Sequence, residues 1–372
     1  MAPASAPDSV VDPFAGVIGQ NRAVAALRST AERPVHAYLL AGPRGAGVEA
    51  AARGFAALLI GAADERTHSL VQRGLHPDVV EFEPEAASYL IDVVRERVLP
   101  EAARAPVESE RKVLVLFEAE RLHRAGHDEV GNALLKTLEE PPDRTVIVLV
   151  TSAPDDLLVT IRSRCQRVDF AALDDEAVAA VLVADGVAPD EAKQAAALAG
   201  GQLARARVLV GPGRALRDAF AAVPARVDGT GATALALAEE LDGAVEAAAT
   251  TLAERQAAEL AELAADLERH GYDERDGTRM RRRMVERHKR EHRRARIDLL
   301  LEGVTAIESV YRDSLATAAP PLNADRPVVH VEPRSAAAAL DACREARHAF
   351  TVNEKGLVRL CALLMTLPPA GR

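Results

Sequence analysis

The sequence has few of the residues that disulfide-rich, aromatic-rich or membrane-spanning proteins need. Among its 372 residues there is no Trp, the aromatic content is 3%, and there are three Cys. Cys165, Cys343 and Cys361 are widely separated, which argues against a disulfide framework or a cysteine zinc cluster. No stretch approaches about 18 uninterrupted apolar residues, so we expect no membrane span. The N-terminus lacks a basic region followed by an apolar run, so we expect no signal peptide and a cytoplasmic location.

The residues that are abundant favour helices. The hydrophobic content is 48% and is rich in Ala, which suits closely packed helices. A chain of this length allows two or three domains with ample cores. The formal net charge of −10 argues against general nucleic-acid binding by the whole chain, so contact with a polyanion would require a local basic patch.

The N-terminal half alternates predicted strands with predicted helices. This alternation predicts an α/β domain with a parallel sheet and helices on both faces. Ligands bind such sheets at the carboxyl ends of the strands. The predicted strands cover residues 36–41, 79–82, 112–117, 146–150 and 167–170, and the predicted helical segments cover 14–30, 54–60, 90–103 and 132–139.

The C-terminal half carries no strand signals after residue 174. Its apolar residues recur at helical spacing, which predicts an all-α region. A Gly-Pro-Gly at residues 211–213 is the expected boundary of one of these helices. The predicted helices cover residues 176–182, 190–198, 209–222, 233–267 (one helix or two), 279–315, 335–350 and 353–365.

A phosphate loop with altered chemistry follows the first predicted strand. Gly42, Gly45 and Gly47 match the spacing of a P-loop, whose backbone N–H groups hold phosphates at the start of a helix. The next two positions should be Lys, for the phosphates, and Ser or Thr, for magnesium. They are Val48 and Glu49. The loop therefore predicts that neither ATP nor magnesium binds.

The end of the third predicted strand shows a second loss. A hydrolytic P-loop enzyme has Asp-Glu there, with the Asp acting through magnesium and the Glu polarising water. This chain has Phe117 and Glu118, and Phe117 cannot contact a hydrated metal ion. We interpret Glu118 and Glu120 as carboxylates at a helix N-terminus, where the helix dipole favours them. Two independent losses in one site predict a subunit without ATPase activity of its own.

A third motif, at residues 161–165, offers a cation. Taken alone, Arg164 would be interpreted as part of a surface salt bridge. At the end of a strand connection, in a site that cannot hydrolyse nucleotide itself, it suggests an arginine finger that stabilises charge on a neighbouring subunit's nucleotide. Ser163 and Cys165 belong to the same motif, and Cys165 is expected to be a buried apolar residue rather than a nucleophile.

These motifs resemble bacterial DNA polymerase III clamp-loader subunits of the AAA+ family. The degenerate nucleotide site is closer to the delta-prime type than to the ATP-binding gamma/tau type. The resemblance implies a disordered N-terminus (1–11), an AAA+ α/β domain (12–171), a helical lid (172–211) and a helical collar (212–372). It rests on residues 42–47 (Gly-Pro-Arg-Gly-Ala-Gly), 132–142 (Asn-Ala-Leu-Leu-Lys-Thr-Leu-Glu-Glu-Pro-Pro) and 161–166 (Ile-Arg-Ser-Arg-Cys-Gln).

The resemblance also implies partners and roles. The subunit would join gamma/tau and delta subunits in a hetero-pentamer of the polymerase holoenzyme, and would act on the sliding clamp and primed DNA through that complex. Arg164 would reach the ATP site of an adjacent gamma/tau subunit. Thr151 or Ser152 would take the first sensor position, and Arg205 the second.

One departure from the family concerns zinc. Family members usually carry a four-cysteine zinc module between the phosphate loop and the second strand, but residues 60–80 contain no Cys. His68 and His76 alone are too few ligands for structural zinc. We therefore expect the zinc to be lost and these two histidines to be solvated.

Two alternatives to this interpretation stay open: an active but atypical P-loop ATPase, and a DNA-binding adapter. The adapter would use residues 279–296, where ten Arg or Lys stand against two Glu. This segment has no aromatic residue for base stacking, so a solvated or inter-subunit basic arm is favoured over direct DNA contact. His288 and His292 within it are expected to be solvated.

Overall fold

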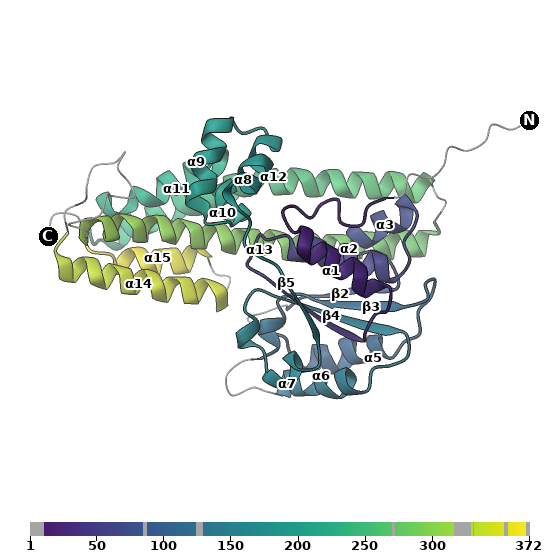
Figure 1. Cartoon of the computed structure of the whole chain (residues 1–372). Coiled ribbons are helices and arrows are strands. Elements are labelled where there is room, and N and C mark those ends of the chain that lie inside the picture. The colour runs from purple at the N-terminus through teal and green to yellow at the C-terminus, as the bar shows by residue number, and fades with distance from the viewer. Residues whose placement is uncertain are drawn as a thin grey trace, which may run out of the picture. The chain divides into compact units, whose positions relative to one another are not determined.

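The structure is a computed structural model, and it describes residues 11–84, 88–123, 129–269, 272–315, 329, 331–352 and 356–369. The predicted disordered N-terminus lies outside the described residues, apart from Val11. The chain divides into an α/β unit, which holds the residues up to Val181, and a helical unit, which holds Arg205–Arg281 and Val285–Arg372 (Figure 1). Residues 182–195 are grouped with the helical unit, and residues 196–204 and 282–284 with the α/β unit. The predicted domain boundaries at residues 171 and 211 stay predictions.

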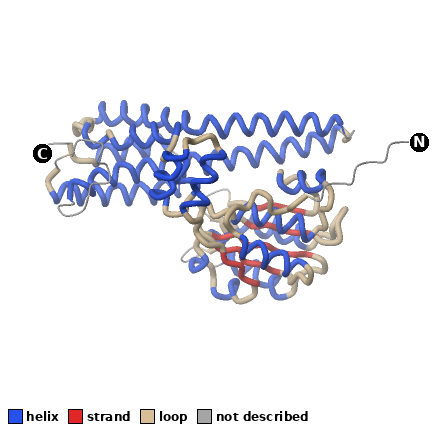
Figure 2. The backbone as a smooth tube through the Cα atoms, turned by 45° about the horizontal axis from the view of Figure 1, so that its top comes forward, coloured by secondary structure: helices blue, strands red, loops and turns tan. Residues whose placement is uncertain are grey.

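The α/β unit is built on a five-stranded parallel sheet in the order β2-β3-β4-β1-β5. Figure 2 shows its strands in red. Three central strands are buried along their whole length, which explains why they appear in the sequence as continuous apolar runs. All five predicted strands are confirmed. Their bounds are β1 (Ala37–Ala41), β2 (Val79–Phe82), β3 (Lys112–Leu116), β4 (Thr145–Thr151) and β5 (Gln166–Asp169).

Helices cover both faces of this sheet, as predicted. Neighbouring strand residues separate the two cores: Leu40 packs with Phe55 on one face, and Leu39 packs with Leu134 on the other. The helical segments are α1 (Asn21–Ala31), α2 (Val48–Leu59), α3 (Glu65–Gln72), α4 (Ile91–Val93), a π-helical turn η1 (Val94–Val98), α5 (Leu99–Ala102), η2 (Ala119–Leu122), α6 (Glu129–Glu139), η3 (Pro154–Asp156) and α7 (Val159–Arg162). The arrangement is the parallel α/β architecture that the alternation of strands and helices predicts.

The rest of the chain is helical. A helix predicted from residue 209 starts later, because Val210 is extended and Pro212 occupies the first turn of α11. Residues 233–267 fall in one helix, α12. The basic helix predicted from residue 279 begins earlier, at Glu274. None of the described helices has the length and apolar content needed to cross a membrane. The helices are α8 (Asp175–Ala184), α9 (Pro189–Ala199), α10 (Leu203–Val208), α11 (Gly211–Ala221), η4 (Val223–Ala225), α12 (Gly231–Arg269), α13 (Glu274–Leu315), α14 (Pro333–Val352) and α15 (Gly356–Thr366).

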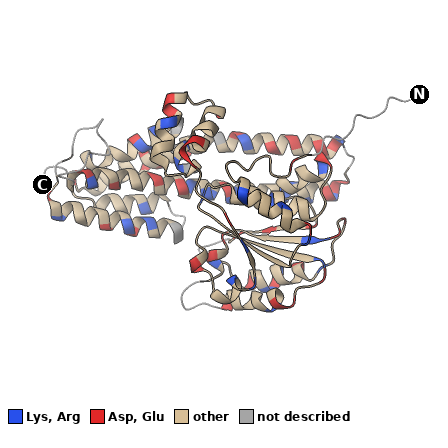
Figure 3. Cartoon of the chain, in the orientation of Figure 1, with Lys and Arg blue, Asp and Glu red and all other residues tan. Residues whose placement is uncertain are grey.

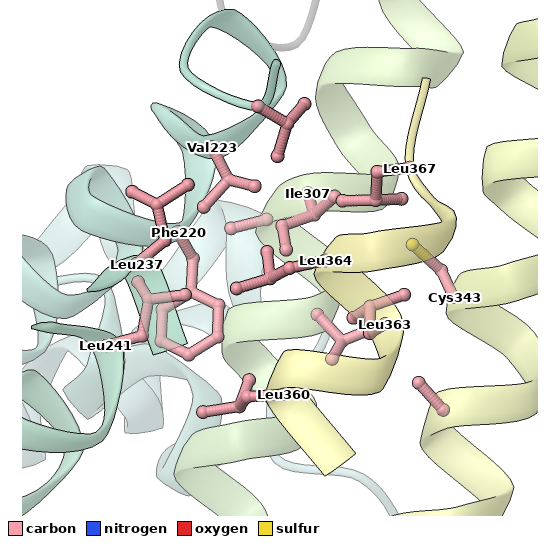
Figure 4. Close-up of a cluster of buried hydrophobic side chains, with 14 of the residues drawn as sticks. Phe220, Val223, Leu237, Leu241, Ile307, Cys343, Leu360, Leu363, Leu364 and Leu367 are labelled. Atoms are coloured by element: carbon pink, nitrogen blue, oxygen red, sulfur yellow. The ribbon is translucent and has the colours of Figure 1, made fainter. Parts of the chain in front are cut away.

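The core of the helical unit is formed by α11 to α15. Leu360, Leu363 and Leu364 on α15 belong to one apolar cluster with Phe220 on α11 and Ile307 on α13 (Figure 4). The Phe220 ring lies so close to α13 that a Cβ atom at Gly303 would be 2.6 Å from it. Only glycine permits this approach of a ring to a helix backbone.

Candidate functional site

The phosphate loop connects β1 to α2, and its glycines are required by the backbone. Gly45 and Gly47 have φ values of +83° and +80°, in the left-handed region that favours glycine. A Cβ atom at Gly42 would lie 2.6 Å from the Cβ atom of Phe170. The Gly42 N–H donates to the carbonyl of Thr151 at 3.1 Å, which ties the loop to β4. The loop therefore keeps the backbone conformation of a phosphate loop.

The side chain at the lysine position is part of the core. Val48 is 6% exposed, and its Cγ2 atom lies 3.0 Å from the position a Cβ atom would take at Gly42. Val48 and Ala46 belong to the same apolar cluster as Phe14 and Phe170. Glu49 is exposed at the start of α2, where a phosphate would otherwise meet the positive end of the helix. The loop thus offers a phosphate no side-chain cation at position 48 and a carboxylate at position 49.

The side chain at the magnesium-ligand position is covered by an arginine. Phe117 is 1% exposed, and the Arg53 guanidinium lies over its ring, with 5.0 Å from Cζ to the ring centroid. Arg53 Nε and Nη2 donate to Glu81 Oε1 at 2.7 Å and Oε2 at 2.9 Å. Burial alone would lower the pKa of Arg53, but the Glu81 carboxylate more than compensates, so this pKa is raised. Arg53, Glu81 and Phe117 therefore form a closed group in which the buried cation is already paired.

Arg53 and Glu81 were not predicted from the sequence as part of the site. Their pairing joins α2 to β2 across 28 residues, and neither belongs to a motif. Two weak signals in the sequence could have indicated the pair. Arg53 is a charged residue on the apolar side of an Ala-rich helix, and Glu81 is the single carboxylate of its strand.

The end of β3 carries backbone strain at the residue that would polarise water. Glu118 has a φ of +49°, which costs free energy for a residue with a side chain, and it pairs with Arg121 at 2.6 Å. Glu118 and Glu120 lie at the start of η2, where they were predicted. Glu120 accepts hydrogen bonds from Thr151 Oγ1 at 2.7 Å and from Ser152 Oγ at 2.9 Å. The hydroxyl groups of Thr151 and Ser152, the two candidates for the first sensor position, thus both donate to the Glu120 carboxylate.

Arg164 lies at the surface just after α7. Its side chain is 33% exposed, Nη1 donates to the carbonyl of Thr160 at 2.8 Å, and Nη2 forms an ion pair with Glu139, the last residue of α6. Ser163 is exposed beside it. Burial raises the pKa of the Cys165 thiol to about 12, which keeps it protonated and unreactive at neutral pH. The motif therefore presents the Arg164 guanidinium, which Thr160 and Glu139 hold in place.

The remaining predicted residues lie elsewhere. Arg205 is on α10 in the helical unit. Its charge acts on Glu302: burial raises the pKa of that carboxyl group, and the positive charges of Arg205 and Arg347 reduce the increase. The expectation that His76 is solvated is wrong: it is 2% exposed, and its Nδ1 accepts a hydrogen bond from Asp78 N–H at 3.1 Å. Within the described parts of the chain, no three His, Cys, Asp or Glu side chains converge as metal ligands would.

Comparison with known proteins identifies the α/β unit. The family described as DNA polymerase III, delta subunit, matches residues 19–174. DNA polymerase III subunit delta' of Pseudomonas aeruginosa is 41% identical over 140 residues, which cover 35% of this chain and 41% of that protein. Residues 19–174 are thus similar to the corresponding part of DNA polymerase III clamp-loader subunits.

Two further relatives are DNA polymerase III subunits of other bacteria. DNA polymerase III subunit tau of Bacillus subtilis is 33% identical over 175 residues, covering 44% of this chain and 30% of that protein. Subunit gamma/tau of Mycobacterium tuberculosis is 35% identical over 196 residues, which cover 48% of this chain and 33% of that protein. The chain thus spans less than half the length of each relative. A gamma subunit-related protein of Thermotoga maritima aligns with 18% identity and a TM-score of 0.40, a similarity too weak to support a conclusion.

Proposed function

We propose that this chain is a non-hydrolysing, delta-prime-type subunit of the DNA polymerase III clamp loader that supplies Arg164 in trans to an ATP site on a neighbouring gamma/tau subunit. It would assemble with gamma/tau and delta subunits and act through the complex on the sliding clamp and primed DNA. The names of its relatives support membership of this machinery. The residues at the phosphate loop support the absence of ATP hydrolysis by this subunit, and the setting of Arg164 supports its action on a neighbouring subunit.

The observation that carries the proposal is the closed group of Arg53, Glu81 and Phe117. Magnesium-ATP in a P-loop needs a cation for its phosphates and a carboxylate that acts through the metal. Here the first position is buried Val48, and the second is Phe117, covered by an arginine that Glu81 already neutralises. Binding would bring phosphate charge close to Glu49 without the cation that a lysine at position 48 would supply, which disfavours it. We therefore expect no nucleotide and no magnesium at this loop.

Arg164 fits the opposite role. A finger must be charged, partly exposed and attached to a defined backbone, and Arg164 meets these conditions at the junction of α7 and β5. Its ion pair with Glu139 is half-exposed, and such pairs contribute at most about 1 kcal/mol. Exchange of this carboxylate for a developing negative charge on a partner's nucleotide would therefore cost little. Arginine fingers accelerate phosphoryl transfer by about 10³-fold or more.

The test compares assembled complexes that carry Arg164→Ala or Arg162→Ala. Arg162 is a neighbouring partly exposed arginine, paired with Asp155 at 2.6 Å, and serves as the matched control. We expect Arg164→Ala to leave assembly intact and to silence the one ATP site it serves, so that DNA-stimulated turnover falls at least by that site's share. Equal turnover in both variants and wild type would refute the finger role.

A further inference from the structure

The outer halves of α12 and α13 (residues 250–269 and 274–296) form a helical hairpin, called here the outer hairpin. Gln256 Nε2 on α12 donates to the carbonyl of His288 at 3.2 Å and to Glu291 Oε2 at 3.0 Å. His288 Nε2 lies 2.9 Å from Glu259 Oε2. Near the tip, a Cβ atom at Gly277 would lie 3.5 Å from Leu267. These contacts show which face of α13 packs against α12.

His288 also corrects an expectation. It is 6% exposed between the two helices rather than solvated, and His292 is 3.9 Å from Glu246. The polar residues of the basic segment are thus divided between an inner face, which holds the hairpin together, and an outer face.

The outer face of α13 carries a line of arginines. At 3.6 residues per turn, Arg275, Arg279 and Arg282 lie roughly half a turn from Gly277 and His288. All three are exposed, and none forms an ion pair with another residue in the parts of the chain that the structure describes. Because α13 is one continuous helix, this line is a property of the helix alone. Farther along the same face, Glu286 is paired with Lys289 at 2.9 Å.

The outer half of the neighbouring helix has five carboxylates against two arginines. Charges of both signs occur along the outer half of α12 (Figure 3). Several of them are paired: Arg255 with Glu259 and Glu291, Arg269 with Asp266. The outer hairpin still carries a net positive charge, with thirteen Arg or Lys against nine Asp or Glu, in a chain whose formal net charge is −10.

We propose that Arg275, Arg279 and Arg282 bind the phosphate backbone of a nucleic acid. Guanidinium groups bind phosphate oxygens in a bidentate manner. Residues 275 to 282 span about 10 Å of helix, over which one strand of duplex DNA presents about three phosphates. A protein partner would need apolar or aromatic anchors at the centre of the interface. Among the exposed large hydrophobic residues that the structure describes, Val285 alone belongs to the outer hairpin, and it is off this line. No aromatic residue lies within 274–296, so the contact would not include base stacking.

This proposal does not depend on the arginine finger, and its test uses the full-length chain without partners. Binding of a labelled DNA duplex is measured between about 50 and 200 mM salt. The variant R275Q/R279Q/R282Q removes three charges with a residue that keeps helix propensity, so the fold should persist. The control R22Q/R312Q/R334Q removes three exposed arginines that also form no ion pair within the described residues.

We expect the wild-type chain and the control to bind with equal salt dependence. The hairpin variant should bind about 10-fold or more weakly at low salt. Its slope of log K against log salt should decrease by about 0.9 for each phosphate that is no longer neutralised, close to three in total. Absence of wild-type binding at 50 mM salt, or equal weakening of both triple variants, would overturn the proposal. So would unchanged DNA affinity in a hairpin variant that instead loses a co-purifying acidic protein.

Discussion

The guanidinium of Arg53 covers the ring of Phe117, with 5.0 Å between Cζ and the ring centroid. This contact joins α2, the helix that follows the phosphate loop, to the end of β3, where a magnesium ligand would stand. The Glu81 carboxylate completes the group from β2. The two halves of a nucleotide site are thus linked to each other by the protein's own side chains.

The first prediction concerns nucleotide affinity. Because Val48 and Phe117 are buried and Arg53 is already paired, magnesium-ATP added to the isolated chain should bind with a Kd above about 1 mM, if at all. Isothermal calorimetry or a fluorescent ATP analogue measures this directly. Tight, magnesium-dependent binding would favour the atypical ATPase instead.

The second prediction concerns the buried ion pair. Glu81→Gln leaves the Arg53 charge poorly compensated, and Arg53→Met leaves the Glu81 charge unpaired, so each should lower the free energy of unfolding by about 3 kcal/mol. The double variant removes both charges and should cost clearly less than the sum of the two singles. Urea unfolding of all four proteins closes the cycle. Additive effects would show that the two side chains do not depend on each other.

The third prediction concerns helix packing. Gly303→Ala places a Cβ atom 2.6 Å from the Phe220 ring and should destabilise the helical unit by about 1–3 kcal/mol. Gly243→Ala is the matched control, because nothing lies within 4 Å of its Cβ position on α12. The control should gain about 0.5–1 kcal/mol, as expected for Ala over Gly in a helix. Equal thermal stability of the two variants would contradict the packing seen in Figure 4.

The fourth prediction concerns pH. Burial would raise the pKa of Asp78, but N–H groups of Val107, Glu108 and Ser109 donate to its carboxylate at 2.6–2.8 Å, and the net pKa is lowered. Because the folded pKa lies below the unfolded value near 3.9, this stabilisation is complete above that value and is lost as pH falls through the folded pKa. Asp78→Asn should therefore be less stable than wild type at pH 7, and the difference should shrink below about pH 4. A difference that stays constant with pH would mean that ionisation does not matter.

The sequence predicted the sheet well because buried parallel strands appear as continuous apolar runs, as in β3 and β4. It missed α3 because that helix is short and polar; its signal was a cap, with Asp64 accepting from Thr67 N–H at 2.8 Å. It also missed α10 between Gly201 and the Pro212 boundary. Short helices carry little periodicity, so tertiary packing decides them.

The candidate site was only partly predictable. Val48 and Phe117 stand in recognisable motifs, so their departure from the P-loop pattern was visible in the sequence. Arg53 and Glu81, which pair beside Phe117, come together through the fold and carry no motif. The burial of His76 and His288 was missed for a related reason: each is a polar residue that faces a neighbouring element, and apolar periodicity does not identify such positions.

The role of Arg164 can be separated from any effect on folding. Its ion pair with Glu139 is half-exposed, so Arg164→Ala should change the free energy of unfolding by less than about 1 kcal/mol. The DNA-stimulated ATPase of the complete clamp loader, assembled with Arg164→Ala, therefore tests the central claim most directly. We predict normal assembly and reduced turnover, with Arg162→Ala close to wild type. Turnover equal to wild type in a fully assembled Arg164→Ala complex would contradict the claim.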